Sequence, residues 1–456
     1  MDNILNNWKK YYRLNNYYHK WIEKIAADLI PDFVSVVEFG SKTGEILSKL
    51  KNKDKTYVEF ETQFVDVLKK KYKSSAFSYI DFIKKNKKYD YILMPHGLSE
   101  IQNIQNFLEK IKKHTNENTK IIVFHFNYFW KPLLDLASKL RLKNPSISEP
   151  NWLSQEDIDN FFYLEGFDKV KQGARFIIPY RIPIISEFVN KYISTLPIFT
   201  LLSLIKFAVY KTPSVTRDYS VSIVIPARNE AGHMKGVLKK IPKFAKKQEI
   251  IFVEGHSTDD TIRVIKDEIK VNKNTKAFLY KQKGKGKGDA VRLGFSKCKN
   301  EILMILDADL TVDPIELPKF YNAIKFDKAE FVMGSRLVYP MEKQAMRTLN
   351  VLGNKFFSWA FSFLLDQRIK DTLCGTKVLL RSNYLRIAQN RKLFGDFDPF
   401  GDYDLIFGAS KLNLKILEIP IRYKERVYGK TNISRFRHGL LLLSMVIFAA
   451  KKIKFI

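Results

Sequence analysis

The sequence predicts two α/β domains within a chain of 456 residues. Three observations carry this prediction: an apolar run at 302–306 that ends in two aspartates, a strand–turn–helix pattern that begins at Val34, and a polar, proline-containing segment at 211–218. A chain of this length suits two or three domains. Because 211–218 directly precedes the first strand of the second half, we expect one domain at 1–212 and another at 213–456.

The first half begins with the pattern of a mononucleotide-binding βαβ unit. Its first strand contains Glu38, a turn with Gly40 and Gly44 follows, and the next strand ends at Glu59, 21 residues after Glu38. A glycine turn before a helix, with an acid further along the chain, is typical of sites where that acid binds ribose hydroxyls. Lys42 stands where such a turn usually carries a small residue.

The second half has a strand that ends in paired carboxylates. The apolar run Ile302–Leu306 is typical of a central strand buried on both faces. Asp307 and Asp309 follow at its carboxyl end, where open α/β sheets bind ligands. Their spacing presents two oxygens to one divalent cation, and Mg²⁺ or Mn²⁺ held by few carboxylates usually keeps substrate phosphates as ligands. We therefore expect a metal and phosphate site here.

Two further strands are expected upstream of this run, at 219–226 and 249–253. The first leads into 227–230, and the second delivers Glu254. The segment 257–260 predicts a helix start, with a Ser or Thr N-cap and first-turn acids. The Gly/Lys run 284–288 opens another helix, and its backbone N–H groups and lysines suit a phosphate. Together these pieces predict a nucleotide-sugar site.

From about Tyr219 onward the chain resembles family 2 glycosyltransferases of the GT-A fold, in particular the polyprenyl-phosphate sugar transferases. The resemblance rests on seven segments in the family's order: 225–230, 253–259, 286–290, 307–314, 333–336, 371–377 and 400–405. One departure is Glu254-Gly-His256, where many relatives have Asp-Asp-Gly. The longer Glu side chain puts the preferred base of the donor in question, and His256 is expected to be a loop residue.

The resemblance implies a metal-dependent enzyme that inverts the configuration at the anomeric carbon. Asp307 and Asp309 would hold Mg²⁺ or Mn²⁺, which stabilises charge on the departing diphosphate. Asp402 would be the acid at the acceptor face, with Asp404 as second candidate; a first-turn helix acid is an equally good interpretation of Asp404. The implied donor-binding residues are Pro226, Ala227, Glu230, Glu254, Lys287, Asp307 and Arg336.

The segment 426–438 is basic, polar and contains Gly429. We expect it to be an arm that closes over the diphosphate, since lids of this kind exclude water and complete a site. Its predicted contact residues are Lys430, Arg435, Arg437 and His438.

The first half resembles class I S-adenosylmethionine-dependent methyltransferases over about residues 15–180. Glu38-x-Gly-x-x-x-Gly is similar to their motif I, 89–97 to the fourth-strand motif, and 120–125 to the fifth strand. Lys42 leaves a non-catalytic scaffold or binding module open. His96 and Glu100 follow the fourth strand, but neither is predicted to be catalytic. The implied S-adenosylmethionine contacts are Glu38, Gly40, Gly44, Glu59 and Asp90.

The charge and the apolar segments bear on partners and location. A formal charge of +30 favours anionic partners, but the lysine, asparagine and isoleucine content also fits compositional drift. No RNA-binding motif accompanies the charge, so nucleic acid is not expected as a partner.

The twelve residues 439–450 are too few to span a bilayer and suit a core helix or an interfacial helix with lysines behind it. The segments 196–209 and 356–365 are further candidates for that face.

Two cysteines exclude a disulfide framework, and the N-terminus lacks a signal pattern, so we expect a cytoplasmic protein at the inner face of the cell membrane. The predicted function is transfer of a sugar from a nucleotide-diphosphate donor to a lipid-phosphate or glycan acceptor in surface glycan assembly. The first domain is expected to add S-adenosylmethionine-dependent methyl transfer.

Overall fold

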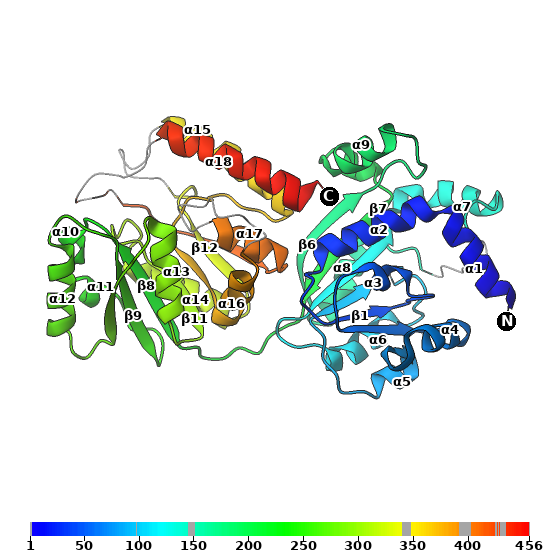
Figure 1. Cartoon of the computed structure of the whole chain (residues 1–456), viewed down its shortest axis with the longest axis horizontal. Coiled ribbons are helices and arrows are strands. Elements are labelled where there is room, and N and C mark those ends of the chain that lie inside the picture. The colour runs from blue at the N-terminus through cyan, green and yellow to red at the C-terminus, as the bar shows by residue number, and fades with distance from the viewer. Residues whose placement is uncertain are drawn as a thin grey trace. The chain divides into compact units, whose positions relative to one another are not determined.

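The computed structural model describes residues 2–96, 98–144, 151–339, 348–391, 403–424, 426, 428 and 435–455. By its internal contacts the chain divides into two compact units, Met1–Ser214 with Lys451–Ile456, and Val215–Ala450. Each unit is built on a mixed sheet of seven strands, which confirms the predicted pair of α/β domains (Figure 1). The exact domain boundary at residue 212 stays a prediction.

The N-terminal unit has the strand order β3-β2-β1-β4-β5-β7-β6. The first five strands run parallel, whereas β7 pairs antiparallel with both β5 and β6. The strands are β1 (Val36–Phe39), β2 (Lys55–Glu59), β3 (Ala76–Ser78), β4 (Tyr91–Met94), β5 (Lys120–Phe126), β6 (Asp168–Arg175) and β7 (Ile205–Lys211). The helices are α1 (Asp2–Leu14), α2 (Asn16–Leu29), α3 (Glu45–Lys49), α4 (Thr62–Tyr72), α5 (Tyr79–Ile83), α6 (Ile104–Ile111), α7 (Lys131–Lys139), α8 (Gln155–Leu164) and α9 (Ile185–Lys191).

Alternating strand residues build two cores in this unit, one on each face of its sheet. Val36 belongs to the core that α2 covers, and the next residue, Val37, belongs to the core that α6 and α8 cover. Successive side chains of a strand point to opposite faces, so a sheet covered on both sides needs apolar residues at every position. The predicted apolar segment 196–209 is divided: Ile205 begins the buried strand β7, and the preceding residues form a connection between strands.

The C-terminal unit has the strand order β10-β9-β8-β11-β13-β12-β14. The first four strands are parallel, β13 is antiparallel to both neighbours, and β14 is parallel to β12. The strands are β8 (Val221–Ala227), β9 (Gln248–Glu254), β10 (Ala277–Lys281), β11 (Ile302–Ile305), β12 (Phe331–Ser335), β13 (Lys377–Leu380) and β14 (Ile416–Pro420). The helices are α10 (Ala231–Met234), α11 (Val237–Lys240), α12 (Thr261–Val271), α13 (Lys287–Lys297), α14 (Leu317–Lys325), α15 (Thr348–Leu365), α16 (Arg381–Gln389), α17 (Tyr403–Lys411) and α18 (Arg435–Ala449).

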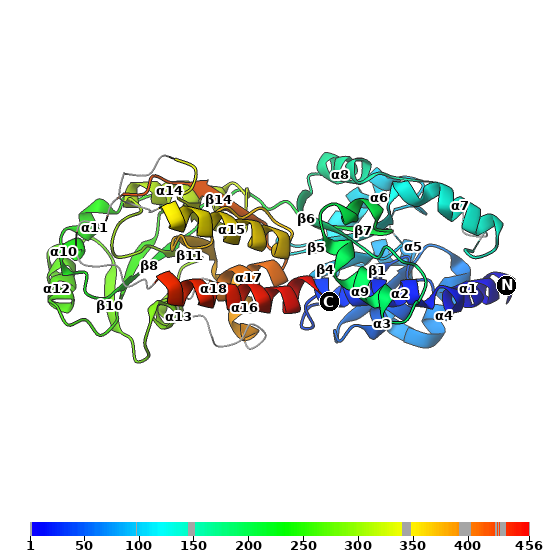
Figure 2. The same ribbon diagram turned by 90° about the horizontal axis from the view of Figure 1, so that it is seen from above.

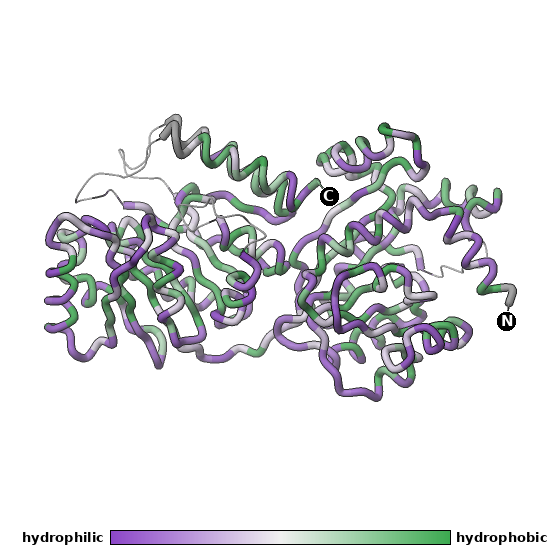
Figure 3. Tube along the Cα trace, viewed as in Figure 1, coloured by the Kyte–Doolittle hydropathy of each residue, from purple (hydrophilic) through white to green (hydrophobic). Residues whose placement is uncertain are grey.

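The local predictions for this unit are mostly confirmed. The glycine and lysine run opens α13, with Gly286 as N-cap in a left-handed conformation (φ +88°). The predicted N-cap at Ser257 or Thr258 is wrong: α12 begins at Thr261 after Asp260, and the Asp259 carboxylate accepts from the Thr261 N–H. The central strands β4 and β11 are apolar and buried at every position, and the middle of each unit is accordingly predominantly apolar in Figure 3.

Helices α15 and α18 lie side by side (Figure 2). Helix α18 contains most of the predicted apolar segment 439–450 and divides it between two environments. Leu442, Met445 and Ala449 are buried, whereas Leu440, Leu443 and Ile447 are exposed. The core and the interfacial interpretation therefore each describe one face of this helix. Among the described residues, no helix has the length and apolar content needed to cross a bilayer.

Candidate functional site

The predicted donor residues gather where the parallel strands of the C-terminal unit end. Pro226 and Ala227 close β8, Glu254 closes β9 in register with Ala227, and Asp307 follows β11. The strand order reverses between β8 and β11, so the loops after these two strands diverge around a crevice. The structure thus brings together acids that are separated by more than 50 residues along the chain.

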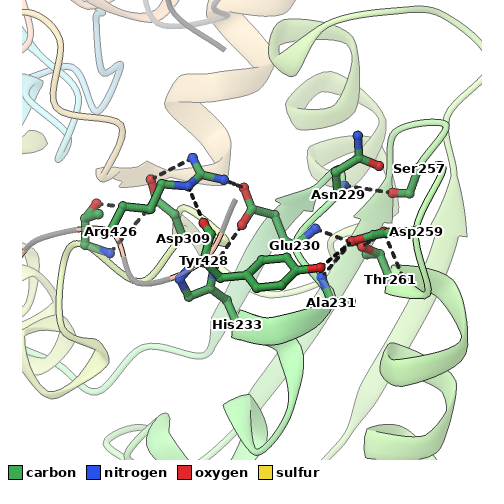
Figure 4. A network of polar contacts seen from close by, with 11 residues as sticks. Asn229, Glu230, Ala231, His233, Ser257, Asp259, Thr261, Asp309, Arg426 and Tyr428 are labelled. Carbon is green, nitrogen blue, oxygen red and sulfur yellow. Dashed lines mark hydrogen bonds and ion pairs between the residues drawn. The ribbon is translucent and has the colours of Figure 1, made fainter. Parts of the chain in front are cut away.

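Glu230 is held by the loop after β8. The preceding residue, Asn229, adopts a left-handed conformation (φ +55°), and the Glu230 N–H donates to the Thr261 hydroxyl at 2.8 Å. One carboxylate oxygen lies 2.8 Å from His233 Nδ1, and the other is bonded by the Arg426 guanidinium (Figure 4). Burial raises the pKa of Glu230 above its ordinary value, although His233 and Arg426 oppose that shift.

Asp307 is paired with a lysine from the phosphate-binding run. The Lys287 ammonium lies 2.6 Å from the Asp307 carboxylate. Burial alone would raise the pKa of Asp307, but the charge of Lys287 holds that pKa below its ordinary value. A Cβ at position 375 would come within 1.9 Å of the Asp307 carboxylate and 2.3 Å of the Lys287 ammonium, so only glycine fits there. Asp307 is therefore ionised and fixed.

Asp309 faces the arm that leads into the C-terminal helix. One of its oxygens accepts from the N–H and the hydroxyl of Thr311, and the other lies 3.8 Å from the Arg426 guanidinium. The arm is tethered beside Asp309 because Tyr423 forms a bridge with Val312 and the Lys424 N–H donates to the Thr311 carbonyl at 3.0 Å. Arg426 therefore contacts two acids predicted to bind the donor and its metal.

Tyr428 continues this contact across the loop after β8. Its hydroxyl lies 3.4 Å from the Asp259 carboxylate, which also accepts from the Ala231 N–H at 3.2 Å. Its ring stands edge-on to His233 and so close to Gly232 that a Cβ there would lie 2.5 Å from it. Figure 4 shows the resulting chain of polar contacts between the arm and the loops after β8 and β9.

Arg336, predicted to bind the donor, is committed to a buried carboxylate. Its guanidinium donates to both oxygens of Asp371, at 2.7 and 2.8 Å, and its backbone N–H donates at 3.0 Å. Burial would raise the pKa of Asp371, but Arg336 outweighs burial and lowers it. The pair joins the end of β12 to the segment that contains Gly375. Arg336 therefore holds the backbone beside the site in position, in addition to any contact with the donor.

The predicted acceptor acids have unequal outcomes. Asp404 lies in the first turn of α17, buried, with its carboxylate 3.0 Å from Arg391 Nε, which favours the interpretation as a helix acid. Asp402 and Lys430 lie outside the described residues. Arg435, Arg437 and His438 open α18, but their side chains also lie outside what the structure describes.

A second cluster lies at the carboxyl ends of β1, β2 and β4 in the N-terminal unit. Gly40 and Gly44 have left-handed φ angles of +70° and +74°, as the predicted turn requires. Glu59 closes β2, and its carboxylate accepts from the backbone N–H groups of Lys42, Phe60 and Glu61 at 2.6, 2.7 and 3.2 Å. Burial raises the pKa of Glu38 to about 8, so this carboxyl is mostly protonated at neutral pH.

Asp90 does not belong to this cluster, and its predicted contact with the cofactor has to be corrected. It precedes Tyr91 at the start of β4, and its carboxylate accepts from the N–H and the hydroxyl of Ser35, which precedes β1. Both residues stand at the amino ends of parallel strands, so Asp90 is on the opposite edge of the sheet from Gly40 and Glu59. Its role is to join two strands.

The Lys42 side chain lies beside Glu59, the acid predicted to contact the cofactor. Its ammonium lies 2.7 Å from Glu61, 2.8 Å from Glu100 and 3.8 Å from Glu59, and the side chain is almost fully buried. Burial disfavours this charge, but the carboxylates outweigh burial and raise the pKa of Lys42.

Helix α1 covers the same loop. Trp8 donates to the Thr43 hydroxyl at 2.9 Å, and its ring stands edge-on to His96. In nucleotide sites the middle glycine of the turn lets the ligand approach the backbone. The residues present here do not fit S-adenosylmethionine, because the Lys42 side chain, paired with Glu61 and Glu100, takes the place next to Glu59.

The C-terminal site does fit a divalent metal with a diphosphate. Asp309 offers a half-buried carboxylate, and among the described residues the cation paired with it is Arg426, at 3.8 Å rather than in a hydrogen bond. Mg²⁺ and Mn²⁺ need only one or two protein carboxylates when phosphates complete the ligand set. Asp309 would hold the metal, with Asp307 beside it, and the metal would stabilise negative charge on the leaving diphosphate.

Comparison with protein-family models defines the class. Residues 222–386 match the model described as glycosyl transferase family 2, and residues 10–172 match a methyltransferase domain. The chain therefore contains a family 2 glycosyltransferase domain preceded by a methyltransferase domain, and both predicted resemblances are confirmed. The presence of these domains establishes neither the donor, nor the acceptor, nor methyl transfer.

Individual relatives match the C-terminal half. Dolichyl-phosphate beta-glucosyltransferase of Saccharomyces cerevisiae is 29% identical over 227 residues, 45% of this chain and 67% of the relative. Undecaprenyl-phosphate 4-deoxy-4-formamido-L-arabinose transferase of Pseudomonas fluorescens is 26% identical over 236 residues, 50% of this chain and 64% of the relative. Glycosyltransferase AglJ of Haloferax volcanii is 27% identical over 224 residues, 48% of this chain and 68% of the relative.

Solved structures match each half distantly. Glucosyl-3-phosphoglycerate synthase of Mycobacterium tuberculosis aligns with a TM-score of 0.37 and 16% identity over 52% of this chain and 80% of that chain. A SAM-dependent methyltransferase of Thermotoga maritima aligns with a TM-score of 0.35 and 14% identity over 46% of this chain and 95% of that chain. At these scores neither match adds to the argument about function.

Two site residues were missed by sequence reasoning, Asp371 and Asp259. Both stand within segments that carry the resemblance, so their presence there was a usable signal. Arg426 begins the segment that was predicted to be an arm, but its pairing with Glu230 was not predicted, because the two residues are 196 positions apart in the chain.

The buried ion pair of Arg336 and Asp371 predicts that the stability of the C-terminal unit depends on pH. Because the folded pKa of Asp371 is depressed, its stabilisation is present above the unfolded pKa of about 3.9 and is lost as pH falls through the lower folded value. At pH 7 we expect Asp371→Ala to destabilise the C-terminal unit by about 3–5 kcal/mol, since Arg336 is left buried without its partner. Denaturant unfolding of the full chain measures this loss of stability. Asp267→Ala, at an exposed position of α12, is the control and should change the free energy of unfolding little. Equal effects of the two substitutions would contradict the role given to Asp371.

Proposed function

We propose that the C-terminal domain transfers a sugar from a nucleoside-diphosphate donor to a polyprenyl phosphate, with inversion at the anomeric carbon and with Mg²⁺ or Mn²⁺. The observation that carries the proposal is the convergence of Glu230, Glu254, Asp307 and Asp309 at the ends of three parallel strands. The names of the yeast and Pseudomonas relatives specify polyprenyl-phosphate acceptors and support this choice over a soluble glycan.

Each acid has a separate task in this reaction. Glu230 and Glu254 would accept hydrogen bonds from the nucleoside, with Pro226 and Ala227 forming the wall beneath it. Lys287 would move from Asp307 toward the diphosphate when the donor and its metal bind, because a dianionic ligand competes for its ammonium. Asp307 and Asp309 would hold the metal, which would stabilise the negative charge of the leaving group.

The bond changes need little protein acid–base chemistry. A phosphate oxygen of the acceptor attacks the anomeric carbon, and the bond from that carbon to the diphosphate oxygen breaks, so the nucleoside diphosphate leaves. A lipid phosphate is already an anion and has no proton that must be removed. Asp402 is then proposed to orient the acceptor, whereas with a sugar hydroxyl it would act as general base.

The arm supplies a cation that responds to the donor. Arg426 contacts both Glu230 and Asp309 in this structure. Its guanidinium therefore occupies the position beside Asp309 that the metal would take. We propose that Arg426 leaves Asp309 when the metal binds and turns to the diphosphate, as lids that complete a site do. Residues 430–438 would follow it.

Asp309→Ala tests the metal role. Transfer from a panel of radiolabelled nucleotide sugars to polyprenyl phosphate in micelles, followed by organic extraction, measures the reaction. We expect a loss on the order of 10²-fold or more, because a preorganised charge on the leaving group is removed. Asp267→Ala in α12 is the matched control and should be as active as the wild type. Full activity of Asp309→Ala in the presence of a chelator would refute the proposal.

For the N-terminal unit we propose a scaffolding or binding role rather than the predicted methyl transfer. The specific observation is the Lys42 ammonium among Glu59, Glu61 and Glu100, in the crevice that the fold reserves for a cofactor. A cationic sulfonium cofactor would have to displace a buried cation, and the three acids around that cation would have to rearrange. This costs far more free energy than binding to a turn that has glycine at position 42.

Lys42→Gly tests this role because it should restore binding. The residue has a φ of +49°, a conformation that glycine adopts without strain. Isothermal titration with S-adenosylmethionine should show no binding to the wild type up to about 1 mM and a dissociation constant of about 10 μM for Lys42→Gly, a gain of at least about 2.7 kcal/mol. Lys42→Met keeps the bulk and should not bind. Micromolar binding to the wild type would contradict the proposal, and so would a folded Lys42→Gly that does not bind.

A further inference from the structure

An unusually long connection joins two neighbouring strands of the N-terminal unit. Strands β6 and β7 pair antiparallel, and 29 residues, 176–204, lie between them. Antiparallel neighbours are usually joined by about 2–5 residues, and longer connections are usually functional. This β6–β7 insertion contains helix α9 and the short 3₁₀ segments η4 (Ile193–Thr195) and η5 (Phe199–Leu202) (Figure 1).

The β6–β7 insertion has its polarity inverted. Ile184, Ile198 and Leu201 are 86%, 78% and 68% exposed, respectively, whereas Ser186, Asn190 and Ser194 are fully buried. Soluble surfaces expose single apolar residues, not a continuous set. The exposed large apolar side chains of the insertion are Tyr180, Ile182, Ile184, Ile185, Phe188, Tyr192, Leu196, Ile198, Phe199, Leu201 and Leu202.

The buried polar side chains satisfy the backbone of the insertion from inside. Asn190 accepts from the N–H groups of Ile177 and Ile178 and donates to the Ile178 carbonyl. Ser186 accepts from the Ile182 N–H and donates to the Tyr180 carbonyl. This arrangement suits a nonpolar surrounding, because a backbone group that cannot reach water must find its partner within the protein.

A second apolar face continues the first. Helix α7 has no buried residue, and its Leu133 and Leu136, followed by Leu140 at its C-cap, recur at the spacing of one helical face. The preceding turn is tied to η5, since Asn127 Nδ2 donates to the Leu201 carbonyl at 2.6 Å and Trp130 Nε1 to the Leu202 carbonyl at 2.8 Å. We call residues 128–142 and 180–202 together the apolar surface.

The charge of the apolar surface indicates which kind of partner binds it. Its two segments contain the cations Lys131, Lys139, Arg141, Arg181 and Lys191, but only two acids, Asp135 and Glu187. Glu187 is already paired with Lys24. Apolar side chains with basic residues beside them are typical of protein faces that lie in the interface of an anionic bilayer. A second copy of this chain would bring like charges together.

We propose that the apolar surface docks the N-terminal unit onto an anionic lipid bilayer, with the side chains of the β6–β7 insertion entering the headgroup and acyl boundary. The inverted polarity of the insertion, its internally satisfied backbone and its excess of cations support a lipid occupant. This docking does not depend on the sugar-transfer reaction.

The native cysteines allow a local test. Cys298 and Cys374 are both buried, so Ile198→Cys can be labelled selectively with an environment-sensitive nitrobenzoxadiazole dye in the full chain. With vesicles of phosphatidylglycerol and phosphatidylcholine, we expect a blue shift and severalfold brightening that quenchers in the acyl chains reverse. Ile80→Cys, at a 64% exposed isoleucine of α5, is the matched control and should not respond.

Vesicle affinity completes the test. Ile184→Ser combined with Leu201→Ser should weaken flotation with these vesicles on the order of tenfold or more, since two apolar side chains no longer enter the bilayer. Ile80→Ser should not change it, and neutral vesicles should bind more weakly. An unshifted dye at Ile198, or an equal response at Ile80, would overturn the proposal even if the chain binds vesicles through α18. Concentration-dependent dimerisation that the double substitution abolishes, without vesicle binding, would also overturn it and would identify a second copy as the occupant.

Discussion

Mutual repulsion of carboxylates at the ends of parallel strands is the constraint on which the C-terminal unit depends. The sheet order places Glu230, Glu254, Asp307 and Asp309 after the carboxyl ends of neighbouring strands, and the charge of Asp309 contributes to the raised pKa of Glu230. Lys287 and Arg426 supply the compensating charges from elements that the sheet itself does not fix. In the proposed reaction these acids would exchange a protein cation for a metal and the diphosphate of the donor.

The N-terminal unit uses the same arrangement with a different result. Lys42 also neutralises acids that follow parallel strands, but it extends from the turn between β1 and α3, is buried, and contacts three carboxylates. A side chain fixed in this way closes its crevice, whereas Arg426 on its tethered arm is partly exposed. Two similar sheets thus carry sites whose cations differ in burial, and for the N-terminal unit we propose a surface for docking instead of catalysis.

Sequence reasoning succeeded where local patterns determine position. The strand that ends before Asp307, the helix after the glycine and lysine run, and the turn at Gly40 all follow from periodicity and turn chemistry. It failed where the direction of a strand, or a contact between residues far apart in the chain, determines where a side chain lies. Asp90 lies beside a strand as predicted, but at its amino end, and the pairing of Arg426 with Glu230 joins residues 196 positions apart. The inverted polarity of residues 176–204 was not visible either, because an apolar run does not reveal which side of it faces inward.

Competition between Arg426 and a metal for Asp309 can be measured directly by isothermal titration of Mn²⁺ into the full chain without nucleotide. Arg426→Gln should bind Mn²⁺ severalfold more tightly than the wild type, because the nearest cation, at 3.8 Å, is removed. Lys424→Gln removes the same charge from the same segment but from a lysine that pairs with Asp313, and it should leave the affinity close to that of the wild type. Equal affinities in the wild type and Arg426→Gln, or an equal gain in Lys424→Gln, would contradict the exchange of a protein cation for the metal.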